Sequence, residues 1–351
     1  MHNRTTPVSV KQYCCAVATN SGEEIHECES FHVTRRKRGR GFQYLLTDNE
    51  KVTEQTLLKR FKGLVIPPMW QDVRISLCEL SKVQAFGYDQ RQRKQYIYHQ
   101  QWEAQQQAEK FARLKQFARV LPQIRKTYVK HLNHEKWDLQ RSCALAVMLL
   151  DRTGIRIGNR AYQQKNGTVG LTTLRRKHME QEGEELAFHF TGKHGKTRHI
   201  DISDPTASQL ICDSAARPGY PVLRYKQGGQ WKDLLSDDVN EYLHSLTEMA
   251  VSAKDFRTWT GTRLAVQQAH EAAALVAEHP RRKFTATLVK LVAETLGNTP
   301  AVCEKYYIHP KVLTALTERF ERKSALPYFD DDNDWLSSDH SDCERATFKL
   351  L

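Results

Sequence analysis

The hydrophobic periodicity of the chain changes near Trp102, and this change limits the folds that the sequence can adopt. Before Trp102, short segments rich in β-branched or aromatic residues are separated by Gly, Pro or charged residues, as is typical of strands. These segments are residues 42–46, 73–77, 85–88 and 95–99. After Trp102, apolar residues recur at helical spacing. We therefore expect an α+β protein, in which a small amino-terminal antiparallel β-sheet domain precedes a larger, mainly α-helical domain.

The helical half contains one predicted hairpin and several predicted helices. Residues 186–191 and 197–202 alternate polar and apolar side chains, so a β-hairpin with lysines at its tip is expected. Helical patterns cover residues 135–151, 206–215, 237–248, 255–279 and 281–296, and a helix that starts beyond Trp102 is expected to be interrupted at Pro122. A short helix should begin with Thr299 as its cap and Pro300 in its first position, and end near His309.

Changes in pattern and charge divide the chain into four parts. Residues 1–34 are expected to form an irregular or poorly ordered leader, residues 35–103 the sheet domain, residues 104–323 the helical domain and residues 324–351 an acidic tail. The tail has seven acidic residues against Arg345 and Lys349 and shows little apolar periodicity. We expect it to be a mobile appendage that either aids solubility or screens a basic surface.

Positive charge dominates the chain as a whole. Lys and Arg number 53 against 41 Asp and Glu, which gives a formal net charge of +12 and a sequence pI of about 9.3. This imbalance favours a polyanionic partner, with nucleic acid as the leading candidate. The basic run at residues 35–40 (RRKRGR) is expected to be a solvated arm that contacts DNA, with a nuclear address as the alternative.

Several other classes of protein are disfavoured. The longest apolar run, residues 143–150, is shorter than the ~20 residues of a membrane helix, and residues 1–30 lack the apolar segment of a signal peptide, so we expect a cytoplasmic protein. The eight cysteines include no CxxC pair, which favours reduced thiols over disulfides or zinc. The segment Gly192-Lys193-His194-Gly195-Lys196-Thr197 lacks the first glycine of a phosphate-binding loop, because that position is Phe190. No HExxH, GxSxG or EF-hand pattern occurs, so chemistry without a metal ion is expected.

Two arginines and a pair of tyrosines occupy positions that suit phosphate chemistry. Arg156 follows an apolar helix at a glycine turn, and Arg257 lies near a predicted helix N-terminus, whose free N–H groups attract phosphate. Tyr306 and Tyr307 lie near the end of the short helix after Pro300. Taken one at a time, the arginines are better explained as surface or ion-pair residues and the tyrosines as packing residues. Single positions therefore do not decide the function.

The order of these residues is more informative than any one of them. Five motifs follow one another: residues 156–159 (RIGN) with 166–174 (NGTVGLTTL), 191–193 (TGK), 254–259 (KDFRTW), 298–300 (NTP) and 305–307 (KYY). Upstream, residues 87–89 (GYD) and 93–98 (RKQYIY) lie in the sheet domain. Together they resemble type IB DNA topoisomerases of the poxvirus and bacterial branch, and the resemblance covers roughly residues 36–320.

This resemblance implies the catalytic fold shared by tyrosine recombinases and type IB topoisomerases, with a five-residue active site. The residues in the family's positions are Arg156, Lys193, Arg257, Asn298 and Tyr307. Asn298 stands where the poxvirus pattern has His, a change that bacterial members share, and it leaves an amide that can donate to a phosphate oxygen. The step from Asn298 in the family pattern selects Tyr307 as the nucleophile, and Tyr306 keeps a packing role.

The resemblance also implies the reaction and the partner. Tyr307 would attack a backbone phosphorus and hold the strand through a 3′-phosphotyrosine, with Lys193 as the general acid and with no ATP, metal or other cofactor. The partner would be duplex DNA, clamped by a monomer. The implied DNA contacts are Lys94, Gln95 and Tyr96 in the sheet domain and Tyr162 and Lys254 on the catalytic side. Tyr98 is open between DNA contact and sheet packing, and no base for Tyr307 is identified.

Two other functions remain open. A tyrosine recombinase shares this chemistry, but it typically carries His at the position of Lys254 and has a helical amino-terminal domain. A structural DNA- or RNA-binding protein would explain the net charge, but it would not require Lys193, Arg257 and Tyr307 in this order.

Overall fold

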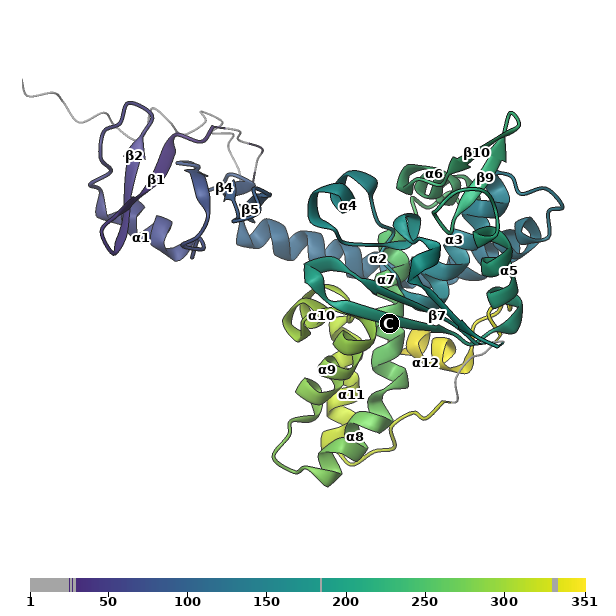
Figure 1. Ribbon diagram of the computed structural model, residues 1–351. Helices are drawn as coiled ribbons and strands as arrows, with labels where there is room; N and C mark the ends of the chain where they lie inside the picture. The colour runs from purple at the N-terminus through teal and green to yellow at the C-terminus, as the bar shows by residue number, and fades with distance from the viewer. Residues whose placement is uncertain (1–24, 26, 28–29, 184, 330–333) are drawn as a thin grey trace, which may run out of the picture. The chain divides into compact units, whose positions relative to one another are not determined.

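The computed structural model describes residues 25, 27, 30–183, 185–329 and 334–351, in two compact units formed by residues 1–109 and 110–351 (Figure 1). The boundary lies inside helix α2 (Gln100–Leu132). From the sequence we expect this boundary at residues 103–104. In the structure the two units meet a few residues later, between residues 109 and 110, and α2 is continuous through both the expected and the observed boundary.

The first unit is an antiparallel sheet with strand order β2-β1-β3-β4-β5. Its strands are β1 (Val33–Arg38), β2 (Gly41–Leu46), β3 (Gln71–Ile75), β4 (Val83–Tyr88) and β5 (Lys94–Tyr98). Helix α1 (Gln55–Gly63) buries Leu57 and Phe61 in the same hydrophobic core as Val33 and Ile75. The structure confirms the predicted amino-terminal sheet, and β1 and α1 are additions to the sequence-based prediction.

Arg35 belongs to the sheet and not to a solvated arm. Strand β1 pairs with β2 along its whole length, and Arg35 is only 8% exposed. Its guanidinium donates to the carbonyls of Ile66 at 2.8 Å and Pro67 at 2.8 Å. The predicted arm is therefore wrong for Arg35, because strand alternation directs this side chain to the buried face, whereas residues 36–40 are exposed. The predicted leader falls mostly outside the described residues, but Val33 is fully buried in β1.

The second unit is mainly helical, as the sequence predicts. Its helices are α3 (Leu139–Thr153), α4 (Arg160–Asn166), α5 (Pro205–Ala215), α6 (Ser236–Leu246), α7 (Ala253–Gln267), α8 (Ala269–Glu278), α9 (Phe284–Leu296), α10 (Pro300–Tyr306), α11 (Pro310–Glu321) and α12 (Asp342–Leu350). Helix α3 lies at the centre, since every residue from 142 to 151 is buried. None of the described helices is long and apolar enough to span a membrane.

Two small sheets accompany these helices. One contains β6 (Met179–Glu182), β7 (Glu185–Thr191) and β8 (Thr197–Ile202), and the other contains β9 (Arg224–Gln227) and β10 (Gln230–Asp233). The pairing of β7 with β8, which ends at Thr191 opposite Thr197, confirms the predicted hairpin. The sequence does not predict the β9-β10 hairpin.

Pro122 lies inside α2 and does not interrupt it. Proline lacks the N–H that would bond to the carbonyl four residues earlier, which is that of Ala118. That carbonyl instead accepts a hydrogen bond from Nε2 of His340 at 2.8 Å. The expected break is therefore wrong, because a residue far along the chain satisfies the freed carbonyl. The helix expected over residues 255–279 is divided at Gln268 into α7 and α8.

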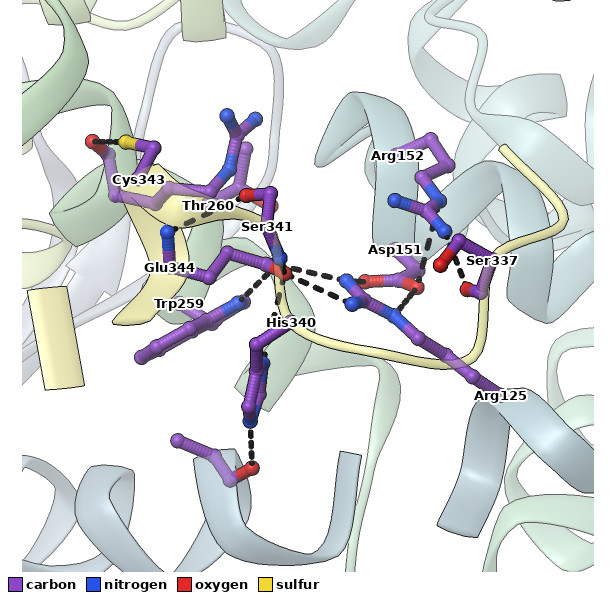
Figure 2. Close-up of polar contacts among 12 residues, drawn as sticks. Arg125, Asp151, Arg152, Trp259, Thr260, Ser337, His340, Ser341, Cys343 and Glu344 are labelled. Atoms are coloured by element: carbon purple, nitrogen blue, oxygen red, sulfur yellow. Dashed lines mark hydrogen bonds and ion pairs between the residues drawn. The ribbon is translucent and has the colours of Figure 1, made fainter. Parts of the chain in front are cut away.

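The C-terminal segment packs against the second unit, so the predicted mobile appendage is wrong for residues 334–351. Trp335 and Cys343 are each 5% exposed and belong to the hydrophobic cores. In Figure 2, Glu344 of α12 and Asp151 of α3 lie on either side of Arg125 of α2. Arg125 reaches Glu344 at 2.7 Å and Asp151 at 2.7 Å. The acidic residues 330–332 lie outside the described residues.

Candidate active site

Arg156 lies in a tight loop that follows α3. Gly154 ends this helix in the left-handed conformation, with φ of +59°, which glycine adopts without strain. The Arg156 carbonyl then accepts from the N–H of Leu171 at 2.8 Å. Where the two segments cross, a Cβ on Gly170 would lie 2.5 Å from the Cα of Gly158. The two glycine-containing motifs therefore hold each other and fix the backbone of Arg156.

Arg257 is buried in α7, with 4% of its surface exposed. Its guanidinium donates to the carbonyls of Gly154 and Leu296, the latter at 2.5 Å. These carbonyls lie at the C-terminal ends of α3 and α9, where a cation is favourable. Arg257 therefore ties together the two helix ends that precede Arg156 and Asn298. Its Nε is buried and has no partner in the part of the chain that the structure describes.

Tyr307 directly follows α10 and rests on α7. The Cζ atom of Arg257 lies 5.0 Å from the centroid of the Tyr307 ring. The Tyr307 carbonyl accepts from the hydroxyl of Thr262 at 3.2 Å. A Cβ on Gly261 would lie 2.6 Å from the same carbonyl, so this approach requires a glycine. Helix α7 thus supplies both Arg257 and the surface that positions Tyr307.

Asn298 links the end of α9 to the start of α10. It is 4% exposed, and its side-chain oxygen accepts a hydrogen bond from Arg156. Its Nδ2 is buried and finds no partner among the described residues. The structure therefore brings together four of the five predicted catalytic residues: Arg156, Arg257, Asn298 and Tyr307. The amide of Asn298 and Nε of Arg257 remain as donors for an anion.

Lys193, the fifth predicted residue, lies at the hairpin tip. It is exposed in the 3₁₀ turn Lys193–Gly195 between β7 and β8, and within the described residues its ammonium has no hydrogen-bond or ion-pair partner. Its neighbour Lys196 donates to the main-chain carbonyl of Asn298. The hairpin is therefore anchored beside Asn298 through Lys196, and Lys193 is available to a ligand.

The positive charge near Tyr307 is partly removed from water. Burial lowers the pKa of Arg156, while its interaction with Tyr307 acts in the opposite direction. Burial also lowers the pKa of Arg257 to about 9, and the nearby charge of Arg156 adds to this effect. Both guanidinium groups still carry their charge near neutral pH. Like charges in a desolvated site favour the binding of an anion, and forked guanidinium donors match a phosphate.

Arg198 is a component of the site that the sequence analysis did not identify. It is 6% exposed, donates to the carbonyl of Thr295 at 2.5 Å, and passes between two glycines. A Cβ on Gly192 would lie 3.1 Å from its side chain, and one on Gly297 would lie 2.4 Å away. Burial lowers the pKa of Arg198 to about 10, and Arg156 contributes in the same direction. The available sequence signal is an arginine at an inward-facing position of β8.

The predicted DNA contacts of the first unit divide between the two faces of β5. Lys94 and Tyr96 are exposed on one face together with Tyr98, whose ring stacks on that of Tyr96 at 5.9 Å. Gln95 points to the other face, where its amide donates to Asp89 at 3.0 Å. The structure therefore does not bring Gln95 to the same surface as Tyr96.

The predicted DNA contacts of the second unit are both exposed. Tyr162 lies on α4 with 44% of its surface exposed, and the side chain of Asn159 caps this helix by accepting from the Tyr162 N–H at 3.2 Å. Lys254 is exposed in the first turn of α7, three residues before Arg257. Both side chains are thus accessible to a ligand.

Comparison with known families assigns this arrangement. A family model described as "Eukaryotic DNA topoisomerase I, catalytic core" matches residues 94–326, a stretch that includes all five site residues. The chain belongs to the type IB DNA topoisomerase family. A second model, "Bacterial DNA topoisomerase IB, N-terminal domain", matches residues 41–89. The two matches confirm the assignment made from the ordered motifs. The protein is a type IB DNA topoisomerase, and DNA is its partner.

Individual relatives agree with this assignment. The DNA topoisomerase 1B of Acanthamoeba polyphaga mimivirus is 27% identical over 302 residues, which cover 82% of this chain and 88% of the relative. The DNA topoisomerase 1B of vaccinia virus (strain Western Reserve) is 21% identical over 243 residues, or 68% of this chain and 74% of the relative. A solved structure of the XerH site-specific recombinase bound to difH substrate aligns at 17% identity and a TM-score of 0.32, covering 57% of this chain and 51% of that chain.

Proposed function

We propose that this topoisomerase relaxes positive and negative supercoils by nicking and resealing one strand of duplex DNA. The Tyr307 oxygen attacks a backbone phosphorus, and the new O–P bond replaces the bond from phosphorus to the 5′ oxygen. The strand stays attached through a 3′-phosphotyrosine while its free 5′ end rotates. The 5′ hydroxyl then attacks the phosphorus and releases Tyr307. One phosphoester replaces another at each step, so the reaction does not consume ATP.

The guanidinium groups and the Asn298 amide stabilise the transferring phosphate. Negative charge collects on the non-bridging oxygens in the transition state, and preorganised donors in a desolvated site are most effective there. Arg156 provides guanidinium donors, and Arg257 provides its Nε donor. Asn298 directs its oxygen to Arg156, which leaves Nδ2 for a phosphate oxygen. Arg257 also places a positive charge beside the nucleophile, since its Cζ lies 5.0 Å from the centroid of the Tyr307 ring.

Lys193 supplies the proton that the leaving 5′ oxygen needs. The exposed hairpin tip allows its ammonium to reach the DNA, and the hydrogen bond from Lys196 to Asn298 keeps the tip beside the site. The ammonium transfers its proton as the bond from phosphorus to the 5′ oxygen breaks. The phenol proton of Tyr307 passes to solvent as the phenolate forms.

The two units divide the work of binding and catalysis in this proposal. The first unit binds DNA through the exposed face of β5, where Lys94 and Tyr96 combine charge with an aromatic surface. The second unit contributes Tyr162 and Lys254 and carries out the chemistry. One copy of the chain is sufficient, because all five catalytic residues come from the same unit.

The observation that carries the proposal is the position of Tyr307 against Arg257, with Arg156 and Asn298 in the same cluster. The test is relaxation of a supercoiled plasmid in EDTA without ATP. We expect complete relaxation through a series of topoisomers, because transesterification needs neither energy input nor a metal ion. Strict dependence on a divalent ion would support metal-assisted cleavage instead.

A tyrosine recombinase is the alternative with the same chemistry. It would convert two suitable duplexes into strand-exchanged products after synapsis, whereas the proposed enzyme relaxes a single plasmid. A DNA-binding protein without catalytic activity would leave the topology unchanged.

A further inference from the structure

Lys110 contacts the nucleophile segment but has no part in the mechanism described above. It lies on the part of α2 that belongs to the second unit. Its ammonium donates a hydrogen bond to the main-chain carbonyl of Tyr306. The same nitrogen lies 5.7 Å from the ring centroid of Tyr306 and 5.9 Å from that of Tyr307. A single cation therefore contacts the peptide before Tyr307 and faces its ring.

We propose that Lys110 is a positioning residue for the nucleophile, which holds the Tyr306–Tyr307 peptide and places a positive charge beside the Tyr307 ring. This inference rests on the proposed role of Tyr307. It assigns a function to a residue of α2 that lies far from the catalytic motifs in the sequence.

The positioning effect follows from the end of α10. The last carbonyls of a helix have no partner within the helix, and a cation there is favourable. Tyr306 is the final residue of α10, and Lys110 binds its carbonyl. The N–H of Tyr307 donates to Cys303 at 2.9 Å, and its carbonyl accepts from Thr262 at 3.2 Å. With Lys110, the peptide groups on both sides of Tyr307 are held, so the direction of its side chain is restricted.

The electrostatic effect follows from the surroundings of the ring. Lys110 adds its charge to that of Arg257 beside the ring, and cations there stabilise the negative charge that develops on the attacking oxygen. Burial lowers the pKa of Lys110 to about 8, whereas Asp255 acts to raise it. A negative charge that forms on Tyr307 favours the charged state of Lys110 in turn. The two groups therefore support each other at the start of the reaction.

Within the described residues, Arg156 and Arg257 also act on Tyr307, and further charged or titratable groups lie around the segment that Lys110 contacts. They are Asp255 of α7, Lys305 and Tyr306 of α10, and His309, which caps α11 and whose ring lies 5.2 Å from that of Phe111. Burial lowers the pKa of His309, so its imidazole is neutral at and above neutral pH. Between about pH 7 and 10, Lys110, whose pKa is about 8, and Arg257, whose pKa burial lowers to about 9, are therefore the groups to compare.

The experiment measures single-turnover formation of the covalent adduct on a labelled duplex between about pH 6 and 10. The variants are Lys110→Met, which removes the charge and the donor, Lys110→Gln, which keeps a donor, and Lys110→Arg, which keeps the charge. Lys126→Met is the matched control, because Lys126 is an exposed lysine on the same helix and in the same unit. The thermal unfolding midpoint of each variant is measured alongside.

We expect Lys110→Met to slow adduct formation by about 10- to 100-fold near pH 7, because the variant lacks a cation that stabilises negative charge on the attacking oxygen. The difference from wild type should shrink above about pH 8, where Lys110 itself loses its proton. Lys110→Gln should show the same slowing near pH 7, and Lys110→Arg should restore the wild-type rate. The slowing by Lys110→Met should persist when the bridging 5′ oxygen is replaced by sulfur, because the effect is on the nucleophile and not on the leaving group.

Two results would overturn the inference while leaving the proposed function intact. One is a Lys110→Met rate equal to that of Lys126→Met. The other is a slowing that is uniform across pH and is not restored by Lys110→Arg, which would indicate a purely structural role. By contrast, the absence of a covalent adduct with the wild-type protein would contradict the proposed function itself.

Discussion

Arg156 donates a hydrogen bond to the side-chain oxygen of Asn298, and this contact determines which end of the amide is available to substrate. The oxygen is engaged by the guanidinium, while Nδ2 is buried without a described partner. An arginine carries only donors, so the amide oxygen must face it. The pair therefore presents donors from both residues to an anion, although Asn298 has no charge.

The contact between Arg156 and Asn298 predicts different rates of adduct formation for two substitutions of Asn298. Asn298→Asp keeps the acceptor for Arg156 but replaces the donor with a negative charge, so adduct formation should slow by more than about 10²-fold. Asn298→His keeps a donor and should lie within about tenfold of wild type. Single-turnover cleavage of a labelled duplex measures both rates. An Asn298→Asp variant as fast as wild type would show that this amide does not contact the phosphate.

Tyr307→Phe should abolish the covalent adduct and leave noncovalent DNA binding nearly unchanged, because it removes only the nucleophilic oxygen. Tyr306→Phe is the matched control, since its neighbouring ring is partly buried and its carbonyl, not its hydroxyl, is the group that Lys110 binds. Adducts are detected after denaturation, and binding is measured by mobility shift. Loss of the adduct in Tyr306→Phe but not in Tyr307→Phe would move the nucleophile to Tyr306.

Lys193→Ala should slow cleavage of ordinary DNA by about 10² to 10⁴ but have little effect when the bridging 5′ oxygen is replaced by sulfur. A thiolate leaves without prior protonation, so the general acid is needed only for oxygen. The comparison uses single-turnover rates on the two matched duplexes. Equal slowing on both would assign Lys193 to DNA binding, and Lys196 on the same hairpin would be the next candidate for the acid.

Arg198→Ala should slow cleavage and also lower the thermal unfolding midpoint. The substitution leaves the carbonyl of Thr295 without its partner and empties the space between Gly192 and Gly297, at a cost of about 1 to 3 kcal/mol. His199→Ala is the control, because His199 is the next residue of β8 and is exposed. If the two variants behave alike, Arg198 does not connect the hairpin to the end of α9.

The catalytic residues could be predicted because each lies in a short motif whose local chemistry is distinctive. Gly158 and Gly170 mark a close backbone crossing, and Thr299 with Pro300 marks the start of a helix. Arg198 and Lys110 could not be predicted in this way. Lys110 contacts a carbonyl 196 residues away, and Arg198 contacts one 97 residues away. Their roles depend on tertiary packing, which local patterns do not record.

The errors in the fold prediction have the same origin. The basic residues of β1 suggest a solvated arm, but the carbonyls of Ile66 and Pro67 accept hydrogen bonds from Arg35. The break expected at Pro122 is avoided because His340 binds the freed carbonyl. The acidic C-terminal segment is ordered over residues 334–351 because Glu344 pairs with Arg125 inside the protein. In each case, a polar group that has no partner nearby in the sequence forms a hydrogen bond or ion pair with a residue far along the chain.

The pairing of Glu344 with Arg125 predicts a specific dependence of stability on pH. Burial would raise the pKa of Glu344, but the nearby His340, whose Nδ1 lies 3.5 Å away, and the hydrogen bonds and charge of Arg125 hold it well below its usual value. Because the folded state favours the carboxylate, the stabilisation is complete above the unfolded pKa of ~4.3 and is lost as pH falls through the lower folded value. Glu344→Gln should therefore lower the free energy of unfolding by about 3 kcal/mol at pH 7, and the difference from wild type should shrink below about pH 4.

Asp342→Asn is the control on the same helix, since Asp342 is exposed and its ion pair with Arg345 lies at the surface. Urea unfolding at several pH values measures both variants. Equal losses for Glu344→Gln and Asp342→Asn, or a difference that does not shrink in acid, would show that the buried pair does not hold the C-terminal helix in place.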